Sequence, residues 1–115
     1  MGRRRALKRP SARRLAIYEA HLPLIDGYVY AFGAWRAQAA GIELDDLRQA
    51  ARLGMWQAAL RFDFSRGTAF STLARYAMRG AMLDALDMAR YGKKPRHRPV
   101  IDQSRFERLP GEGND

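Results

Sequence analysis

The sequence predicts an all-α protein in which three or four helices pack around one hydrophobic core. With 115 residues the chain is long enough for one small domain, with no room for a second core. Apolar residues make up 47% of the chain and aromatic residues 10%, which is typical of a globular protein. The apolar side chains recur at three- and four-residue steps, the period of an amphipathic helix.

Two helices are predicted in the first third of the chain. Ser11 can cap a short helix that runs through Ala20, because its hydroxyl accepts a hydrogen bond from a free amide. Pro23 either kinks this helix or opens a second one in its first turn. The second helix is expected from Leu22 to about Gln38. Its apolar stripe is expected to be buried: Leu22, Ile25, Tyr28, Val29, Phe32 and Trp35.

A third helix is predicted after Gly41, ending near Arg61. Glu43, Asp45 and Asp46 place three carboxylates at its start, where the positive end of the helix dipole stabilises them. A divalent metal is the alternative partner of these acids, but dipole partners are the commoner case, so no metal or other cofactor is predicted. The side chains available for burial on this helix are Leu47, Ala51, Leu53, Met55, Ala58 and Ala59.

The longest predicted helix follows a turn formed by Asp63, Ser65 and Gly67. Ser71 or Thr72 is expected to cap its first amides, and Gly92 to end it. One face is expected to be buried: Phe70, Leu73, Ala74, Ala77, Met78, Ala81, Ala85 and Met88. The opposite side carries Arg75, Tyr76, Arg79 and Leu83.

Composition divides the chain into three parts. Residues 1–14 hold seven basic residues and no acid, and this arm is expected to be flexible. It either solubilises the protein or binds phosphates by counterion release. Residues 15–91 are predicted to form the helical domain, and residues 92–115 an extended tail that is basic first and acidic last.

The charge of the chain favours an anionic partner. The net charge is +9, and only Lys8, Lys93 and Lys94 among the 21 basic residues are lysine. Arginine makes bidentate hydrogen bonds to phosphate and stacks on bases, which favours nucleic acid over an anionic membrane as the partner. There is no cysteine and no run of about 18 apolar residues, so a cytoplasmic, nucleoid-associated protein without a membrane partner is predicted.

Catalytic signatures are missing from the sequence, whereas a nucleic-acid signature is present. The chain has no cysteine nucleophile, no glycine-rich phosphate loop and no HExxH spacing, so no enzyme is predicted. Unpaired bases bind by stacking on aromatic faces within a positive groove, at about 1–3 kcal/mol per base. Phe62 and Phe70 are expected to lie partly in the core. The residues expected to be exposed are Arg66, Arg75, Tyr76 and Arg79.

Residues 45–86, DDLRQAARLGMWQAALRFDFSRGTAFSTLARYAMRGAMLDAL, resemble region 2 of bacterial sigma factors, the RNA polymerase subunit that melts promoters. The most specific parts are FDxxxGxxFSTxA and RGAMLDxL, and the second is similar to the flagellar class. The resemblance covers about Leu22 to Ala89. The chain is also similar to small region-2-like proteins that activate phage-derived gene clusters in alphaproteobacteria, including gene transfer agent regulators.

The resemblance implies two binding surfaces. One grips the coiled coil of the polymerase clamp: Asp46, Leu47, Gln49, Arg52, Leu53 and Trp56. Ala50 and Arg52 stand where the family usually has an acid and an asparagine. Trp56 is either an exposed interface residue or a residue of the core. The other surface binds a −10-like single strand: Phe62, Arg66, Thr68, Phe70, Ser71, Thr72, Arg75, Tyr76, Arg79, Gly80 and Leu83. Leu73 and Ala77 replace a stacking tyrosine and a tryptophan of the family, so the usual −10 sequence is not expected to be read in the usual way.

The predicted function follows from this resemblance. The tail resembles only the opening of a sigma linker, and no domain that reads the −35 element follows. The protein is therefore expected to stay on the early elongation complex, with elongation factors, and to promote antitermination of a specific gene cluster. The alternative is the region-2 half of a split sigma factor that initiates with a separate DNA-binding activator. A module that sequesters a sigma or anti-sigma factor without touching DNA is a further alternative.

Overall fold

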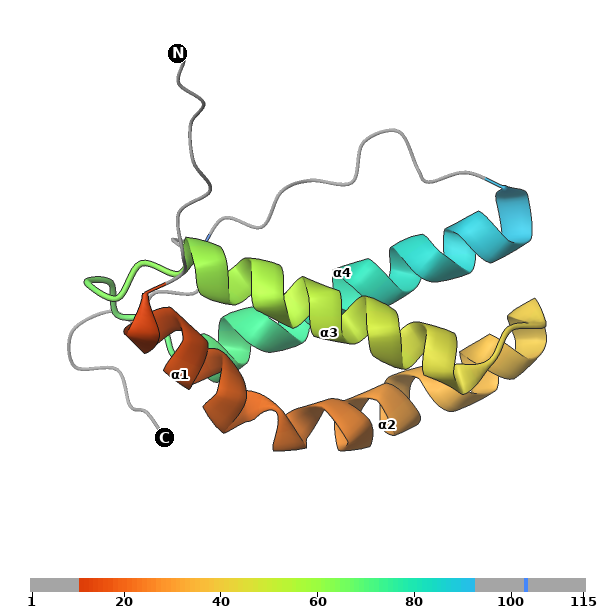
Figure 1. Cartoon of the computed structure of the whole chain (residues 1–115). Helices are drawn as coiled ribbons and strands as arrows, with labels where there is room; N and C mark the ends of the chain where they lie inside the picture. Colours follow the sequence, from red (N-terminus) through yellow and green to blue (C-terminus); the bar gives the residue numbers. More distant parts are fainter. Residues whose placement is uncertain (1–10, 93–102, 104–115) are drawn as a thin grey trace, which may run out of the picture.

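The computed structural model describes residues 11–92 and residue 103, and this part of the chain forms four helices (Figure 1). The helices are α1 (Ala12–His21), α2 (Pro23–Ala40), α3 (Leu44–Arg61) and α4 (Phe70–Tyr91). The three long helices run alternately back and forth, with α4 behind α3 in the view of Figure 1. The predicted all-α fold is confirmed. None of these four helices is long and apolar enough to cross a membrane.

The predicted arm and tail lie mostly outside the described residues. The helical part begins before the predicted boundary at residue 15, because α1 already includes Ala12, Arg13 and Arg14. Of the tail, Gln103 is described, and it lies against the loop between α3 and α4.

Three predicted helix ends are confirmed. Ser11 caps α1, with its hydroxyl accepting a hydrogen bond from the Arg14 amide at 3.2 Å. Pro23 is the first residue of α2, a position whose N–H has no acceptor within the helix, so proline loses no hydrogen bond there. Gly92 ends α4 with a φ of 74°, in the left-handed region that glycine enters without steric cost.

The predicted cap of the longest helix is wrong. The helix begins one residue earlier than Ser71 and its N-cap is Ala69, which makes no side-chain hydrogen bond. Phe70 packs into the core against Phe62, with the two ring centroids 5.2 Å apart, and this burial brings the chain into the helix before Ser71. The start of α4 is therefore determined by packing and not by a polar cap.

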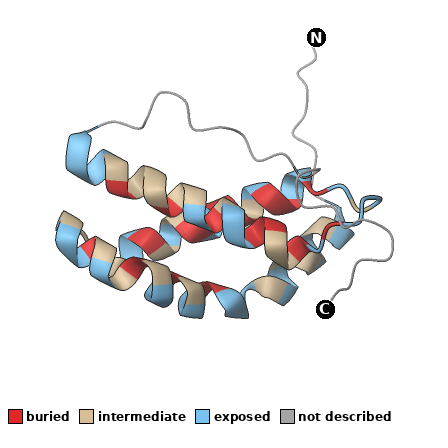
Figure 2. Cartoon of the chain, turned by 180° about the vertical axis from the view of Figure 1, so that it is seen from behind, coloured by how far each residue is buried: buried red, intermediate tan, exposed pale blue. Residues whose placement is uncertain are grey.

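The buried stripe of α2 differs from the predicted one. Its buried residues recur in steps of four: Ile25, Val29, Gly33 and Ala37. Leu22 and Trp35 were expected on this stripe but are 37% and 61% exposed. The helix is rotated towards its small residues because a Cβ at Gly33 would lie 2.7 Å from Leu47 Cδ1 of α3. The buried residues of all three long helices face one another in the interior (Figure 2).

The closest approach in the core brings α3 and α4 together at Gly54. A Cβ added there would lie 2.7 Å from the Ala77 carbonyl oxygen and 2.9 Å from Ala81 Cβ. Small residues around this point are fully buried on both helices, among them Ala51 and Ala74. Backbone contact between α3 and α4 therefore requires glycine at this position.

Arg14 attaches α1 to the end of α3. Its guanidinium Nη1 donates hydrogen bonds to the carbonyl oxygens of Ala59, at 2.8 Å, and Phe62, at 2.7 Å. The last carbonyls of a helix have no partner within the helix, and a cation is favoured at that end of its dipole. One charged side chain thus closes α3 and positions the start of the following loop.

We expect Gly54→Ala to lower the free energy of unfolding by about 1–2 kcal/mol. Overpacking costs about 1–3 kcal/mol and outweighs the gain of up to about 1 kcal/mol in helix propensity. Gly27→Ala is the matched control, because a Cβ there meets nothing within 4 Å, and it should stabilise by about 0.5–1 kcal/mol. Urea unfolding of the two variants measures both effects, and equal stabilities would contradict the close approach.

Arg14→Ala should cost about 2 kcal/mol of unfolding free energy, because two carbonyls at the end of α3 lose a charged donor. Its neighbour Arg13 serves as the control. The guanidinium carbon of Arg13 lies 3.8 Å from the Phe64 ring centroid and the side chain is exposed, so Arg13→Ala should cost less than about 1 kcal/mol. Denaturant titration followed by circular dichroism separates the two, and the reverse order would show that Arg14 does not anchor α1.

Candidate functional site

The outer side of α3 carries a stripe of exposed residues of mixed chemistry. We call it the open stripe, and its members recur at three- and four-residue steps: Asp46, Gln49, Leu53, Gln57 and Leu60. Leu53 is 56% exposed and Leu60 is 41% exposed, and they lie seven residues apart. Two leucines at this spacing form the apolar seam that a partner helix covers in a coiled coil. The stripe therefore suits an amphipathic helix.

The two polar residues at the start of the open stripe differ in what they do within the fold. Asp46 closes a capping box, in which its carboxylate accepts from the Glu43 amide at 3.3 Å and the Glu43 side chain accepts from the Asp46 amide. Gln49 is exposed one turn further along. Asp46 thus has a structural role as well as an exposed position, whereas Gln49 and Leu53 can be replaced without removing a cap.

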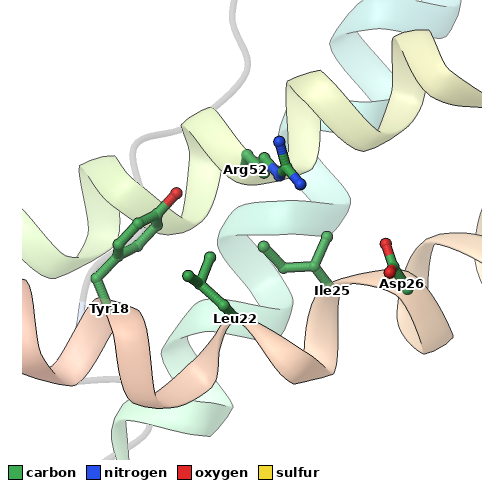
Figure 3. Close-up of a pocket in the computed structure, with 5 residues that line it drawn as sticks. All are labelled: Tyr18, Leu22, Ile25, Asp26 and Arg52. Atoms are coloured by element: carbon green, nitrogen blue, oxygen red, sulfur yellow. The ribbon is translucent and has the colours of Figure 1, made fainter.

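Arg52 and Trp56 lie on a neighbouring stripe of α3 that faces the junction of α1 and α2. Arg52 lines a pocket of about 350 Å³ together with Tyr18, Leu22, Ile25 and Asp26 (Figure 3). Trp56 is half-buried and packs edge-on against Tyr18, with ring centroids 5.0 Å apart. Trp56 therefore packs against the core without being fully buried, and its place on the polymerase surface stays a prediction.

Leu47 does not belong to the predicted polymerase surface. It is 0% exposed and packs in the core, opposite Gly33 of α2. Its neighbours in the sequence are exposed because one residue rotates a helix by about 100°. The burial that the helical period predicts for Leu47 is confirmed, and only its place on the polymerase surface is wrong. Leu53 was also expected to be available for burial, but it is 56% exposed. The other four residues keep exposed or half-exposed side chains.

An ion network joins α2 to the first turns of α3. Arg48 donates to Asp26 at 2.9 Å and to Asp45 at 2.6 Å. Hydrogen bonds from Arg48 and then Gln49 lower the pKa of the Asp45 carboxyl, and the bonds to Asp26 and Asp45 raise the pKa of Arg48. The acids at this helix start therefore hold arginine and amides. Within residues 11–92 and residue 103, no group of three or more His, Asp or Glu side chains is arranged to hold a metal ion.

The loop between α3 and α4, residues 62–69, is held in place from inside. The Asp63 carboxylate accepts from the Ser65 amide at 3.0 Å and from the Ser65 hydroxyl at 2.6 Å, and these bonds lower the pKa of Asp63. Arg66 bonds the second oxygen of the same carboxylate at 3.3 Å. The predicted turn chemistry is therefore present, and it orients the exposed Arg66.

A tail residue also binds this loop. Gln103 pairs with both backbone groups of Asp63: its side-chain oxygen accepts from the Asp63 amide at 2.9 Å, and its side-chain nitrogen donates to the Asp63 carbonyl at 3.0 Å. The Thr68 hydroxyl donates to the Gln103 carbonyl at 3.3 Å. No periodic pattern in the sequence indicates this contact, because it joins residues about forty positions apart.

Three residues of the predicted DNA surface are buried. Phe62 is 5% exposed, Thr68 6% and Phe70 4%, so their side chains offer little to a base. Phe62 and Phe70 pack edge-on in the core, as expected in part, and Phe64 packs edge-on against Phe62. These aromatic residues shape the loop, and the burial of Phe62 and Phe70 leaves little ring surface for a stacked base.

The remaining DNA candidates lie along α4. Thr72, Tyr76, Arg79 and Leu83 recur at steps of four, three and four, and we call this line the α4 stripe. Arg75, Tyr76 and Arg79 are exposed, as is Arg66 in the loop, which confirms the four predicted exposures. Ser71, Thr72, Gly80 and Leu83 are half-buried. The fully exposed members of this set are therefore three arginines and one tyrosine.

Some exposed residues were missed from the sequence. Leu60 extends the open stripe, and its spacing of seven from Leu53 was a readable signal. Trp35 and Arg36 contact each other on α2, and Arg79 of α4 reaches Phe32 of the same helix, but no local pattern connects α2 to α4. The sequence alone therefore predicts Trp35 on the buried stripe and gives Arg36 no role.

Comparison with known proteins gives the family. The family model of Sigma-70 region 2 matches residues 17–90. RNA polymerase sigma factor FliA of Escherichia coli is 53% identical over 47 residues, which cover 41% of this chain and 20% of that protein. RNA polymerase sigma factor FliA of Pseudomonas aeruginosa is 36% identical over 59 residues, which cover 51% of this chain and 24% of that protein.

These alignments cover only a small part of each relative. The chain spans about a fifth to a quarter of the length of these curated relatives. No solved structure matches the chain. The matched family segment runs from the middle of α1 to the last turn of α4 and so includes the open stripe, the α3–α4 loop and the α4 stripe. This chain belongs to the Sigma-70 region 2 family.

Proposed function

We propose that this protein is a transcription regulator that binds the clamp coiled coil of RNA polymerase and holds a −10-like non-template strand. One observation carries the proposal: α3 and α4 bury their small-residue faces against each other and present two outward surfaces of different chemistry. The open stripe is apolar with an acid and amides, and the α4 stripe with its neighbour Arg75 presents two arginines and an aromatic ring. Family membership supports assigning the first to polymerase and the second to DNA.

The open stripe supports binding of a helical partner. Leu53 and Leu60 supply apolar contacts one heptad apart, and Asp46 and Gln49 offer an acceptor and an amide on the same side. Exposed leucines surrounded by polar groups are the usual composition of a protein interface centre and rim. A clamp coiled coil offers a matching amphipathic helix.

The α4 stripe supports holding a strand without reading its sequence. Leu73 is 5% exposed and Gly80 has no side chain, so two positions that the resemblance associates with the −10 element present nothing to a base. Arg75, Tyr76 and Arg79 are exposed, which supports contacts with phosphates and with one stacked base. This chemistry suits a strand that polymerase has already opened.

We therefore favour action after initiation. In this role the protein stays on the early elongation complex at the nucleoid and, with elongation factors, promotes read-through of a specific gene cluster. A cluster of the phage-derived or gene transfer agent type is the candidate target. The same lack of base-reading side chains favours one alternative, a split sigma factor in which a separate DNA-binding activator supplies promoter recognition.

Substitutions should separate the two surfaces. Leu53→Asp places a charge in the apolar seam and should reduce co-purification of core RNA polymerase by about tenfold or more, since a central interface residue typically contributes about 2 kcal/mol. The triple reversal of Arg66, Arg75 and Arg79 to Glu should keep polymerase co-purification and abolish single-strand binding. Affinity purification and strand-binding assays on the full chain measure both.

Met88→Asp is the control for the seam variant, because Met88 is 46% exposed on α4 and lies on neither surface. It should leave co-purification unchanged. Normal polymerase recovery with Leu53→Asp would show that the open stripe is not the docking surface. Full activity of the triple reversal in cells would instead favour the sequestering module, which needs no DNA contact.

Chromatin profiling of the tagged protein should distinguish the two proposed stages of transcription. For a factor that stays with elongating polymerase, we expect occupancy that extends from the promoter into the transcribed gene cluster. Treatment with an inhibitor of initiation should then clear the downstream signal in the order of transcription. A profile confined to promoters would rule out read-through and support the split sigma factor.

A further inference from the structure

An aromatic and arginine cluster on α2 lies beside the α4 stripe and belongs to neither proposed surface. We call it the α2 shelf, and it consists of Tyr28, Phe32, Trp35 and Arg36. Trp35 is 61% exposed, although tryptophan is a residue that proteins usually keep largely buried. An exposed indole beside a fixed cation calls for a functional explanation.

The members of the shelf contact one another. The rings of Tyr28 and Phe32 are nearly parallel, with an interplanar angle of 9° and centroids 6.1 Å apart. The Arg36 guanidinium carbon lies 4.1 Å from the Phe32 ring centroid and 4.4 Å from that of Trp35. Arg36 Nη1 also donates to the Phe32 carbonyl at 2.7 Å, which fixes the cation between the two rings.

The shelf continues the α4 stripe. The guanidinium carbon of Arg79 lies 5.6 Å from the Phe32 ring centroid, so this residue of α4 borders both surfaces. Two arginines and two rings, Phe32 and Trp35, thus form one connected patch across α2 and α4. A strand held by Arg79 would pass next to Trp35.

We propose that Trp35 stacks an unpaired base of the strand that the α4 stripe holds, with Arg36 and Arg79 beside the flanking phosphates. This inference rests on the proposed strand binding and adds a second stacking site to it. Aromatic faces within a cationic groove bind single strands, whose bases expose their π-faces, in preference to duplexes, whose bases are stacked. Continuity with the α4 stripe through Arg79 favours nucleic acid over a protein partner here.

Fluorescence anisotropy of the full chain with two labelled probes tests the proposal. One probe is oligo-dT of about 15 nucleotides, and the other is an abasic strand of the same length and charge. Trp35→Ala should weaken oligo-dT binding by about tenfold, since one stacked base typically contributes about 1–3 kcal/mol, and abasic binding by less than about twofold. Trp35→Phe should keep most of the affinity for oligo-dT.

Tyr30→Ala is the matched control. Tyr30 is 68% exposed on the same helix and lies one turn after Asp26, which pairs with Arg48 of α3, so it projects from another side of α2 than the shelf. It should bind both probes as the unsubstituted protein does. Because both positions are exposed, circular dichroism should show folded variants with unchanged melting.

The outcomes separate the shelf from the proposed function. Equal oligo-dT binding by Trp35→Ala and Tyr30→Ala would overturn the shelf, and strand binding by α4 would still stand if Arg79→Glu reduced it. Lower co-purification of polymerase with Trp35→Ala, without a change in either probe, would assign the shelf to a protein and also overturn the inference. A full chain that binds neither probe would contradict the proposed function itself.

Discussion

Close contact between α3 and α4 at Gly54 determines how the rest of the molecule is arranged. The two backbones approach so closely that a single methyl group at this position would meet a carbonyl oxygen at 2.7 Å. Small buried residues on both helices, such as Ala51 and Ala74, allow this contact along their length. Because the small faces must turn inwards, the larger polar and charged side chains must turn outwards, and both candidate surfaces follow from that constraint.

The connection between these helices shows a division of roles among aromatic and charged residues. Phe62 and Phe70 are buried at its two ends, and Arg14 closes the end of α3 by bonding the Phe62 carbonyl. Gln103 bonds the backbone of Asp63 from the other side. The aromatic side chains therefore hold the loop in shape, while Arg66 is exposed and bonds the Asp63 carboxylate.

Local chemistry predicted much of the fold. Ser11, Pro23 and Gly92 were identified as helix ends because capping, a missing N–H and a left-handed φ depend on a few neighbouring residues. Ser71 and Thr72 were wrongly chosen as caps because a competing contact, the burial of Phe70, began the helix earlier. Among the site residues, the exposure of Arg66, Arg75, Tyr76 and Arg79 followed from helical period and charge.

The sequence by itself determined that the protein is all-α, where three of its helix ends fall, and that it resembles region 2 of sigma factors, because each depends on local pattern or on motif identity. Only the tertiary structure decided that Leu53, Met88 and Trp35, which were expected on buried faces, are exposed, and that Arg79 of α4 reaches the Phe32 ring of α2. An amphipathic period defines which residues share a face but leaves the rotation of that face undetermined by tens of degrees. That rotation is set by where a neighbouring helix can approach, and here the approach depends on Gly33 and Gly54.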